Sequence, residues 1–155
     1  LLNEYFRGNM LIGAGTVMSA SQVKLAFQAG ADYIISPNVD RDVIQKTKEL
    51  GLVSIPGALT ATEIQSAYEY GADYVKLFPA GDIGKEYIKA VLAPLKHIKI
   101  IAVGGINSHN LIDYLSLGIH GVGIGSNIVN KELIAKKDFS AITELAFSYT
   151  RQIQE

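Results

Sequence analysis

The chain has 155 residues, of which 48% are hydrophobic and 19% charged, and its formal net charge is -1 at pH 7. This balance is ordinary for a globular protein, and it argues against nucleic acid or an acidic membrane surface as a partner. The chain contains no cysteine, so disulfides and thiolate chemistry are excluded. We expect one domain, residues 1–155, in a cytoplasmic protein.

The first residues, Leu1–Gly8, read like the end of a helix that a glycine closes, with no methionine in front of it. We therefore expect the sequence to be the later part of a longer chain.

Short apolar runs rich in β-branched residues recur along the sequence, and segments with helical periodicity separate them. Asp40–Leu50 has such a periodicity, and Thr60 with Glu63 forms the pattern of a helix-capping box. The runs predict strands at Met10–Gly13, Tyr33–Ser36, Leu52–Ile55, Tyr74–Phe78, Ile98–Val103 and Gly121–Ile124. Alternation of strand and helix predicts an α/β protein with a parallel sheet.

Such units can form an open doubly wound sheet or part of an eight-stranded barrel. Gly104-Gly105 follows one of the last two predicted strands, and Gly125-Ser126 follows the other, where a helix is expected to open. In TIM barrels, a common phosphate site uses the loops after strands seven and eight. The sequence therefore predicts an α/β fold of the TIM (β/α)8 barrel class, here six βα units that correspond to strands 3–8.

Lys76 is the candidate reactive residue, since it lies near the carboxyl end of an apolar strand. Strand alternation puts Tyr74, Lys76 and Phe78 on one face. An amine that is desolvated there has a lowered pKa, which suits attack on a carbonyl. The alternatives are a lysine paired with a buried carboxylate and one that extends to solvent.

The two glycine clusters offer backbone amides to an oxyanion, and Ser126 adds a hydroxyl. We predict phosphate binding by Gly104, Gly105, Gly125 and Ser126. The three histidines have no ligand spacing, so we expect no metal site.

Thr16 follows Gly13-Ala14-Gly15 at the end of the first predicted strand. It can bind a substrate carboxylate or carbonyl, or it can cap the next helix. Pro37, Pro56 and Pro79 are expected to stop strands.

Taken together, these motifs resemble those of the 2-keto-3-deoxy-6-phosphogluconate aldolases and their phosphogalactonate relatives. The motifs stand in the family's order over nearly the whole chain: Gly13-Ala14-Gly15-Thr16-Val17, Ile55-Pro56-Gly57, Val75-Lys76-Leu77-Phe78-Pro79-Ala80, Val103-Gly104-Gly105-Ile106 and Gly125-Ser126. The resemblance implies that Lys76 forms a Schiff base, that Thr16, Pro56 and Phe78 contact substrate, and that the glycines and Ser126 hold its phosphate.

The same resemblance implies a metal-independent lyase that needs no cofactor. It would cleave a phosphorylated 2-keto acid to pyruvate and glyceraldehyde 3-phosphate, as a homotrimer. Val103 stands where phosphogluconate enzymes commonly carry threonine, which favours the phosphogalactonate branch. The family's general-base glutamate and a substrate-binding arginine lie on a second strand that this sequence does not contain.

Two other functions remain open at this point. One is a phosphate-binding barrel isomerase or synthase, such as a thiamine-phosphate or indole-glycerol-phosphate enzyme, which would need no imine-forming lysine. The other is a phosphate-binding or self-associating chain without catalytic activity.

Overall fold

The computed structural model describes residues 1–6 and 8–154. The helices are α1 (Leu2–Phe6), α2 (Ala20–Gln28), α3 (Arg41–Glu49), α4 (Ala61–Glu69), α5 (Ala80–Ile83), α6 (Lys85–Leu92), α7 (Leu111–Leu115), α8 (Lys131–Ala135) and α9 (Phe139–Gln154). The strands are β1 (Gly13–Ala14), β2 (Tyr33–Ile35), β3 (Val53–Ile55), β4 (Gly57–Ala58), β5 (Val75–Leu77), β6 (Ile100–Val103) and β7 (Gly121–Gly123). No described helix is both long and apolar enough to span a membrane.

All the strand pairs are parallel, in the orders β1-β2-β3 and β4-β5-β6-β7. Only Pro56 separates β3 from β4, so the chain from Val53 to Ala58 is one interrupted strand. It pairs with β2 through its first half and with β5 through its second half. The sheet therefore continues across Pro56, which interrupts the strand because proline has no amide to donate.

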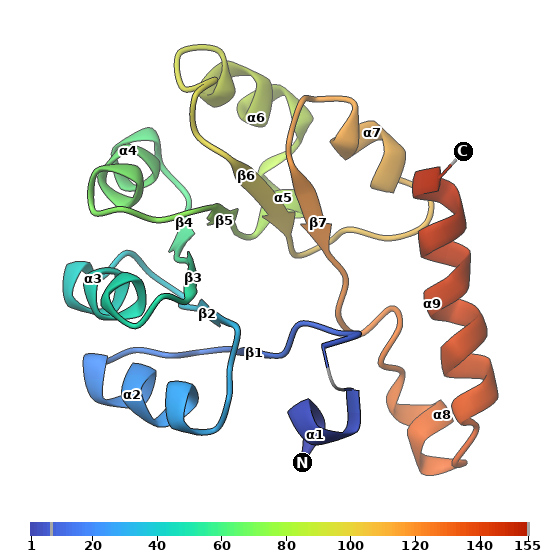
Figure 1. Ribbon diagram of the computed structural model, residues 1–155. Coiled ribbons are helices and arrows are strands. Elements are labelled where there is room, and N and C mark those ends of the chain that lie inside the picture. The colour runs from blue at the N-terminus through green and yellow to red at the C-terminus, as the bar shows by residue number, and fades with distance from the viewer. Residues whose placement is uncertain (7, 155) are drawn as a thin grey trace.

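The strands follow an arc, and helices α2, α3, α4, α6 and α7 lie around its outside (Figure 1). Burial of the side chains alternates accordingly. Val75 and Leu77 are fully buried toward the helices, whereas Lys76 between them is half-buried on the inner face. A doubly wound sheet would carry helices on both faces. The prediction of a partial barrel is therefore confirmed over the alternative.

Two hydrophobic clusters lie between the strands and the helices. The smaller one, under β1, β2 and β3, consists of Val17, Val23, Ile34, Val43 and Leu52, with partly buried neighbours. The larger one, under β4 to β7, includes Ile64, Val75, Leu77, Ile88, Ile100 and Leu111. The interrupted strand joins the two parts of the sheet under which these clusters lie.

Most of the predicted helix starts are confirmed. Asp40 caps α3 by accepting the amide of Val43 at 3.0 Å, and Thr60 and Glu63 form the expected capping box of α4. The first strand was predicted at Met10–Gly13, but the observed strand β1 is shorter and begins only at Gly13. The amide of Ile12 donates to the Asp32 carboxylate at 2.6 Å instead of joining the ladder.

Candidate active site

Lys76 occupies the middle of β5, with strands on both sides. Its amide donates to the carbonyl of Pro56 at 2.8 Å, and its Cα pairs with those of Gly57 and Ile101. Hydrogen bonds to a neighbouring strand and a packed outer face fix the backbone beneath the side chain. The reactive candidate therefore stands on a rigid part of the fold.

The Lys76 amine projects into a cavity of about 370 Å³ on the inner face of the sheet. Burial lowers the pKa of Lys76 from its usual value, because desolvation disfavours the ammonium form. No carboxylate pairs with this amine among the described residues. Of the alternatives for this lysine, the buried ion pair is thus excluded within that part of the chain.

The ring of Phe78 lies beside the amine, with its centroid 4.6 Å from Lys76 Nζ. This is a cation–π contact, which favours a positive charge on the nitrogen. Phe78 itself is 47% exposed, so it stands at the opening of the site and is accessible to a ligand.

Most of the cavity walls come from residues outside the motifs, with Ile55 and Val103 among the exceptions. They are mostly apolar: Tyr33, Ile35, Ile55, Ile101, Val103, Val122 and Ile124. Side chains alternate between the two faces of a strand, and this alternation would have placed five of them on the same face as Lys76: Tyr33, Ile35, Ile55, Ile101 and Val103. An apolar cavity with one amine is suited to hold a small carbonyl compound out of water.

The loops after β6 and β7 present free amides. Gly104 and Gly105 have φ of +89° and +73°, and the carbon atom that a side chain would add at Gly104 would lie 2.9 Å from the Phe78 ring. Within the described chain, the N–H groups of Gly104, Gly105, Gly125 and Ser126 donate to no protein acceptor. Gly105, Gly125 and Ser126 are also exposed, so an anion can reach their amides.

A side-chain bond joins these two loops: Asn127 Nδ2 donates to the carbonyl of Ile106 at 2.8 Å. The structure therefore brings the two predicted phosphate-binding loops together. Sequence reasoning missed Asn127, since nothing in the pattern distinguishes it from an ordinary turn residue.

The prediction of a helix that opens at Gly125 is wrong. The segment forms a single turn, in which the amides of Ile128 and Val129 both donate to the Gly125 carbonyl at 3.0 Å. Asn130 then adopts an extended conformation and caps the separate helix α8. One turn carries little of a helix dipole, so any anion here depends on individual amides.

Thr16 has a φ of +59°, a rare conformation for a β-branched residue. The cap of α2 is Ser19, whose hydroxyl accepts the amide of Gln22 at 3.3 Å. The helix-capping alternative for Thr16 is therefore excluded. Thr16 is exposed, and strained residues of this kind occur at ligand sites.

Pro56 has a fully buried ring. Its carbonyl holds the Lys76 amide, so the residue reaches the site through the backbone of β5. The direct substrate contact that the resemblance implied would require the ring to be uncovered first.

The expectation about a metal site concerns groups away from the amine. Among the described residues, no group of three His, Asp or Glu side chains is arranged to hold a metal.

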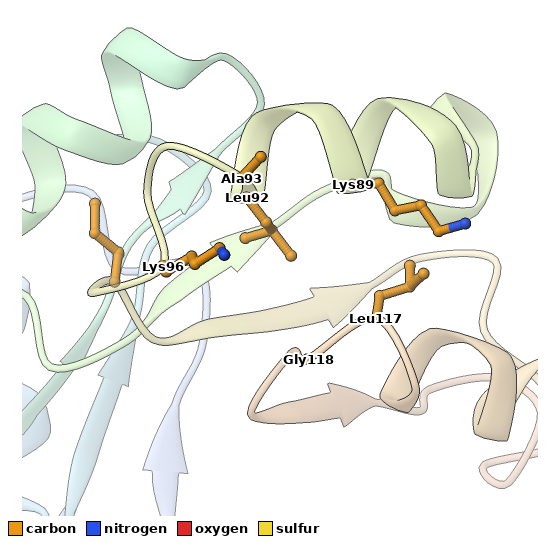
Figure 2. A pocket seen from close by; sticks show the side chains of 7 residues that line it. Lys89, Leu92, Ala93, Lys96, Leu117 and Gly118 are labelled. Atoms are coloured by element: carbon orange, nitrogen blue, oxygen red, sulfur yellow. The ribbon is translucent and has the colours of Figure 1, made fainter.

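A second cavity, of about 450 Å³, lies between α6 and the loop after α7 (Figure 2). Leu92, Ile98 and Leu117 line it, with Lys89 and Lys96 beside them. Ile98 and Gly118 precede β6 and β7, so this cavity lies near the amino ends of the strands. In barrels the reaction site lies at the carboxyl ends, and the inner cavity with Lys76 is therefore the candidate site.

Comparison with known proteins places the chain in a family. Residues 3–145 match the family model described as KDPG and KHG aldolase. The chain belongs to this aldolase family. A family member from Escherichia coli K12, 2-dehydro-3-deoxy-6-phosphogalactonate aldolase, is 40% identical over 119 residues, which cover 76% of this chain and 58% of the relative.

Two other family members give the same result. The 2-dehydro-3-deoxy-phosphogluconate aldolase of Haemophilus influenzae is 38% identical over 141 residues, 90% of this chain and 66% of the relative. The solved structure of KDPG aldolase from Legionella pneumophila, with pyruvate captured as a covalent carbinolamine, has a TM-score of 0.85 and 35% identity. The match covers 93% of this chain and 70% of that one. The chain thus spans less than two thirds of the length of the curated relatives named here.

Proposed function

We propose that the chain takes part in the reversible aldol cleavage of a phosphorylated 2-keto sugar acid, with Lys76 as the Schiff-base residue. The observation that carries this proposal is the half-buried Lys76 amine, with a lowered pKa, inside the inner cavity. The related Legionella enzyme, which holds pyruvate as a covalent carbinolamine, supports the same chemistry.

In the proposed reaction, the neutral Lys76 amine attacks the 2-keto carbon, and the carbinolamine loses water to give an iminium ion. The iminium withdraws the electron pair of the bond between carbons 3 and 4 as that bond breaks, which leaves an enamine of pyruvate. The aldehyde departs, the enamine takes up a proton, and water releases pyruvate and the free amine.

A base must remove the proton of the carbon-4 hydroxyl during the cleavage. No carboxylate lines the inner cavity in the described part of the chain. The resemblance assigns this role to a glutamate on a strand that the matched motifs do not include. We therefore assign imine formation and phosphate binding to the residues of this chain. The proton transfer is assigned to the glutamate that the resemblance implies.

The phosphate is proposed to lie at Gly104, Gly105, Gly125 and Ser126 after β6 and β7, of which Gly105, Gly125 and Ser126 are exposed. Thr16 and Phe78 are proposed to contact the rest of the substrate. Fixing the phosphate at a distance from the lysine supplies binding energy that orients the reacting carbons. Val103 lines the cavity, and this supports the phosphogalactonate branch because a valine offers no hydrogen bond to a carboxylate.

Trapping with borohydride tests the central step. Pyruvate with sodium borohydride should add one reduced pyruvate to the peptide that contains Lys76, as mass spectrometry would show. Lys76→Ala should abolish the adduct. An isomerase or synthase of the same fold would form none, and adduct on another lysine would refute the assignment.

We also propose a single-domain chain that works in the cytoplasm as a homo-oligomer, a trimer by the resemblance. Phosphorylated metabolites are charged and stay in the compartment in which they are made, which supports that location. Exposed apolar side chains such as Met18, Leu25 and Val129 provide surface for self-association. Sedimentation velocity would measure the oligomeric state.

A further inference from the structure

Three carbonyl groups in the loop after β6 are each held by a donor from a different element. Gly104 O accepts the amide of Gly81, at 2.8 Å, from α5. Gly105 O accepts Asn110 Nδ2 at 2.9 Å, from the residue in front of α7. Ile106 O accepts Asn127 Nδ2 at 2.8 Å, from the loop after β7.

These bonds determine where the amides of the same loop point. In a trans peptide the C=O of one residue and the N–H of the next are directed to opposite sides. Holding Gly104 O therefore turns the Gly105 N–H away from α5, and holding Gly105 O turns the Ile106 N–H away from Asn110. Neither N–H donates to an acceptor within the described chain.

The bond to Gly104 O rests on a very close backbone contact. A side-chain carbon added to Gly105 would lie 2.9 Å from Gly81 Cα, and one added to Gly81 would lie 2.7 Å from Gly105 Cα. A glycine is therefore required at position 81 for α5 to come close enough for the Gly81 N–H to donate to Gly104 O. Tyr114 OH donates to Ala80 O at 3.3 Å and so fixes the peptide that carries the Gly81 N–H.

We infer that Gly81, Asn110 and Asn127 are positioning residues for phosphate: the first two orient the amides of the Gly104–Ile106 loop, and Asn127 holds the loop after β7 beside them, so that the amides of both loops converge on the anion. This inference rests on the phosphate site of the proposed function. None of the three needs to touch the ligand. Gly81 and Asn110 act through the opposite ends of the peptide groups whose carbonyls they hold. Asn127 acts by holding the loop after β7, which carries the Gly125 and Ser126 amides, against the Gly104–Ile106 loop. Free loop peptides would otherwise have to be ordered each time an anion binds.

Asparagine-to-leucine substitutions separate this role from general stability. Asn127→Leu keeps the size of the side chain and removes the donor to Ile106 O. Asn130→Leu is the matched control three residues away, since among the described residues the Asn130 side chain bonds to Glu132 N and Leu133 N at the start of α8 and to no group of the Gly104–Ile106 loop. Calorimetric titration with inorganic phosphate gives the affinity, and pyruvate trapping on Lys76 reports on the rest of the site.

Asn127→Leu should raise the Kd for phosphate about three- to tenfold, the effect of losing one hydrogen bond, with pyruvate trapping unchanged. Asn110→Leu should act in the same direction, and Asn130→Leu should lower the melting temperature without changing the Kd. An unchanged Kd in Asn127→Leu and Asn110→Leu would overturn the inference alone. Failure of the unmodified chain to bind phosphate would overturn it together with the phosphate part of the proposed function.

Discussion

Lys76 Nζ lies 4.6 Å from the centre of the Phe78 ring, and the two side chains share one face of β5 and its extension. Two effects therefore act on the same nitrogen. Burial favours the neutral amine, which is the form that attacks a carbonyl, whereas the ring favours a positive nitrogen. Burial is what lowers the pKa of the free amine. After the imine has formed, the nitrogen is again cationic, and the ring then stabilises the intermediate.

The lowered pKa of Lys76 predicts unusual reactivity at moderate pH. A lower pKa gives a larger neutral fraction at each pH below the ordinary value of 10.5. Lys85 provides an internal control, because Asp113 holds its pKa above that value. Trace acetylation followed by peptide mass spectrometry should show Lys76 becoming reactive at a lower pH than Lys85. Coincident or reversed profiles would contradict the assignment.

Phe78→Leu should weaken imine formation without preventing folding. Loss of a cation–π contact of about 0.5–1 kcal/mol corresponds to about a two- to fivefold lower yield of trapped pyruvate. Phe27→Leu is a suitable control, since Phe27 lies on α2 and has nearly the same exposure, 46% against 47%. Equal yields from the two variants would show that the ring does not act on the lysine.

Gly105→Ala should reduce phosphate affinity and stability together, because it forces a side chain against Gly81 at a φ of +73°. We expect a loss of about 1–3 kcal/mol in the free energy of unfolding. Gly118→Ala meets the same backbone strain at a φ of +84° but has no atom within 4 Å of the added carbon. Denaturant titrations of both variants isolate the steric part, and a smaller loss in Gly105→Ala than in Gly118→Ala would contradict the close contact.

Unfolding should be a single cooperative transition in spite of the two hydrophobic clusters. The strand from Val53 to Ala58 belongs to both halves of the sheet, so neither half can lose it alone. Circular dichroism, calorimetry and near-ultraviolet tyrosine signals should give one common midpoint. Two separated transitions would show that the clusters unfold as independent units.

Much of the fold follows from local patterns. The repeated strand and helix segments, the capping box at Thr60 and the alternation around Lys76 are properties of short stretches of chain, and the structure confirms them. The grouping of the two glycine loops also agrees with their places after the last two strands.

Features that depend on contacts between distant residues could not be predicted in this way. Strand β1 is shorter than predicted because the Asp32 carboxylate, twenty residues away, accepts the hydrogen bond of the Ile12 amide. The helix expected at Gly125 is one turn, because Asn130 starts a separate helix and Asn127 bonds to another loop. The strained backbone of Thr16 has no signature in the sequence, since threonine rarely adopts a positive φ.

The position of Lys76 in the sheet has a consequence for local opening of the structure. Among the described residues, strand β5 has neighbours on both sides, whereas β7, which leads into Gly125 and Ser126, pairs with β6 alone. Backbone amides of an edge strand exchange with solvent through small fluctuations, and those of a central strand exchange only through larger ones. In the native state the amides of β7 should therefore exchange faster than those of β5, so the less protected strand leads into the proposed phosphate site while the more protected one carries Lys76.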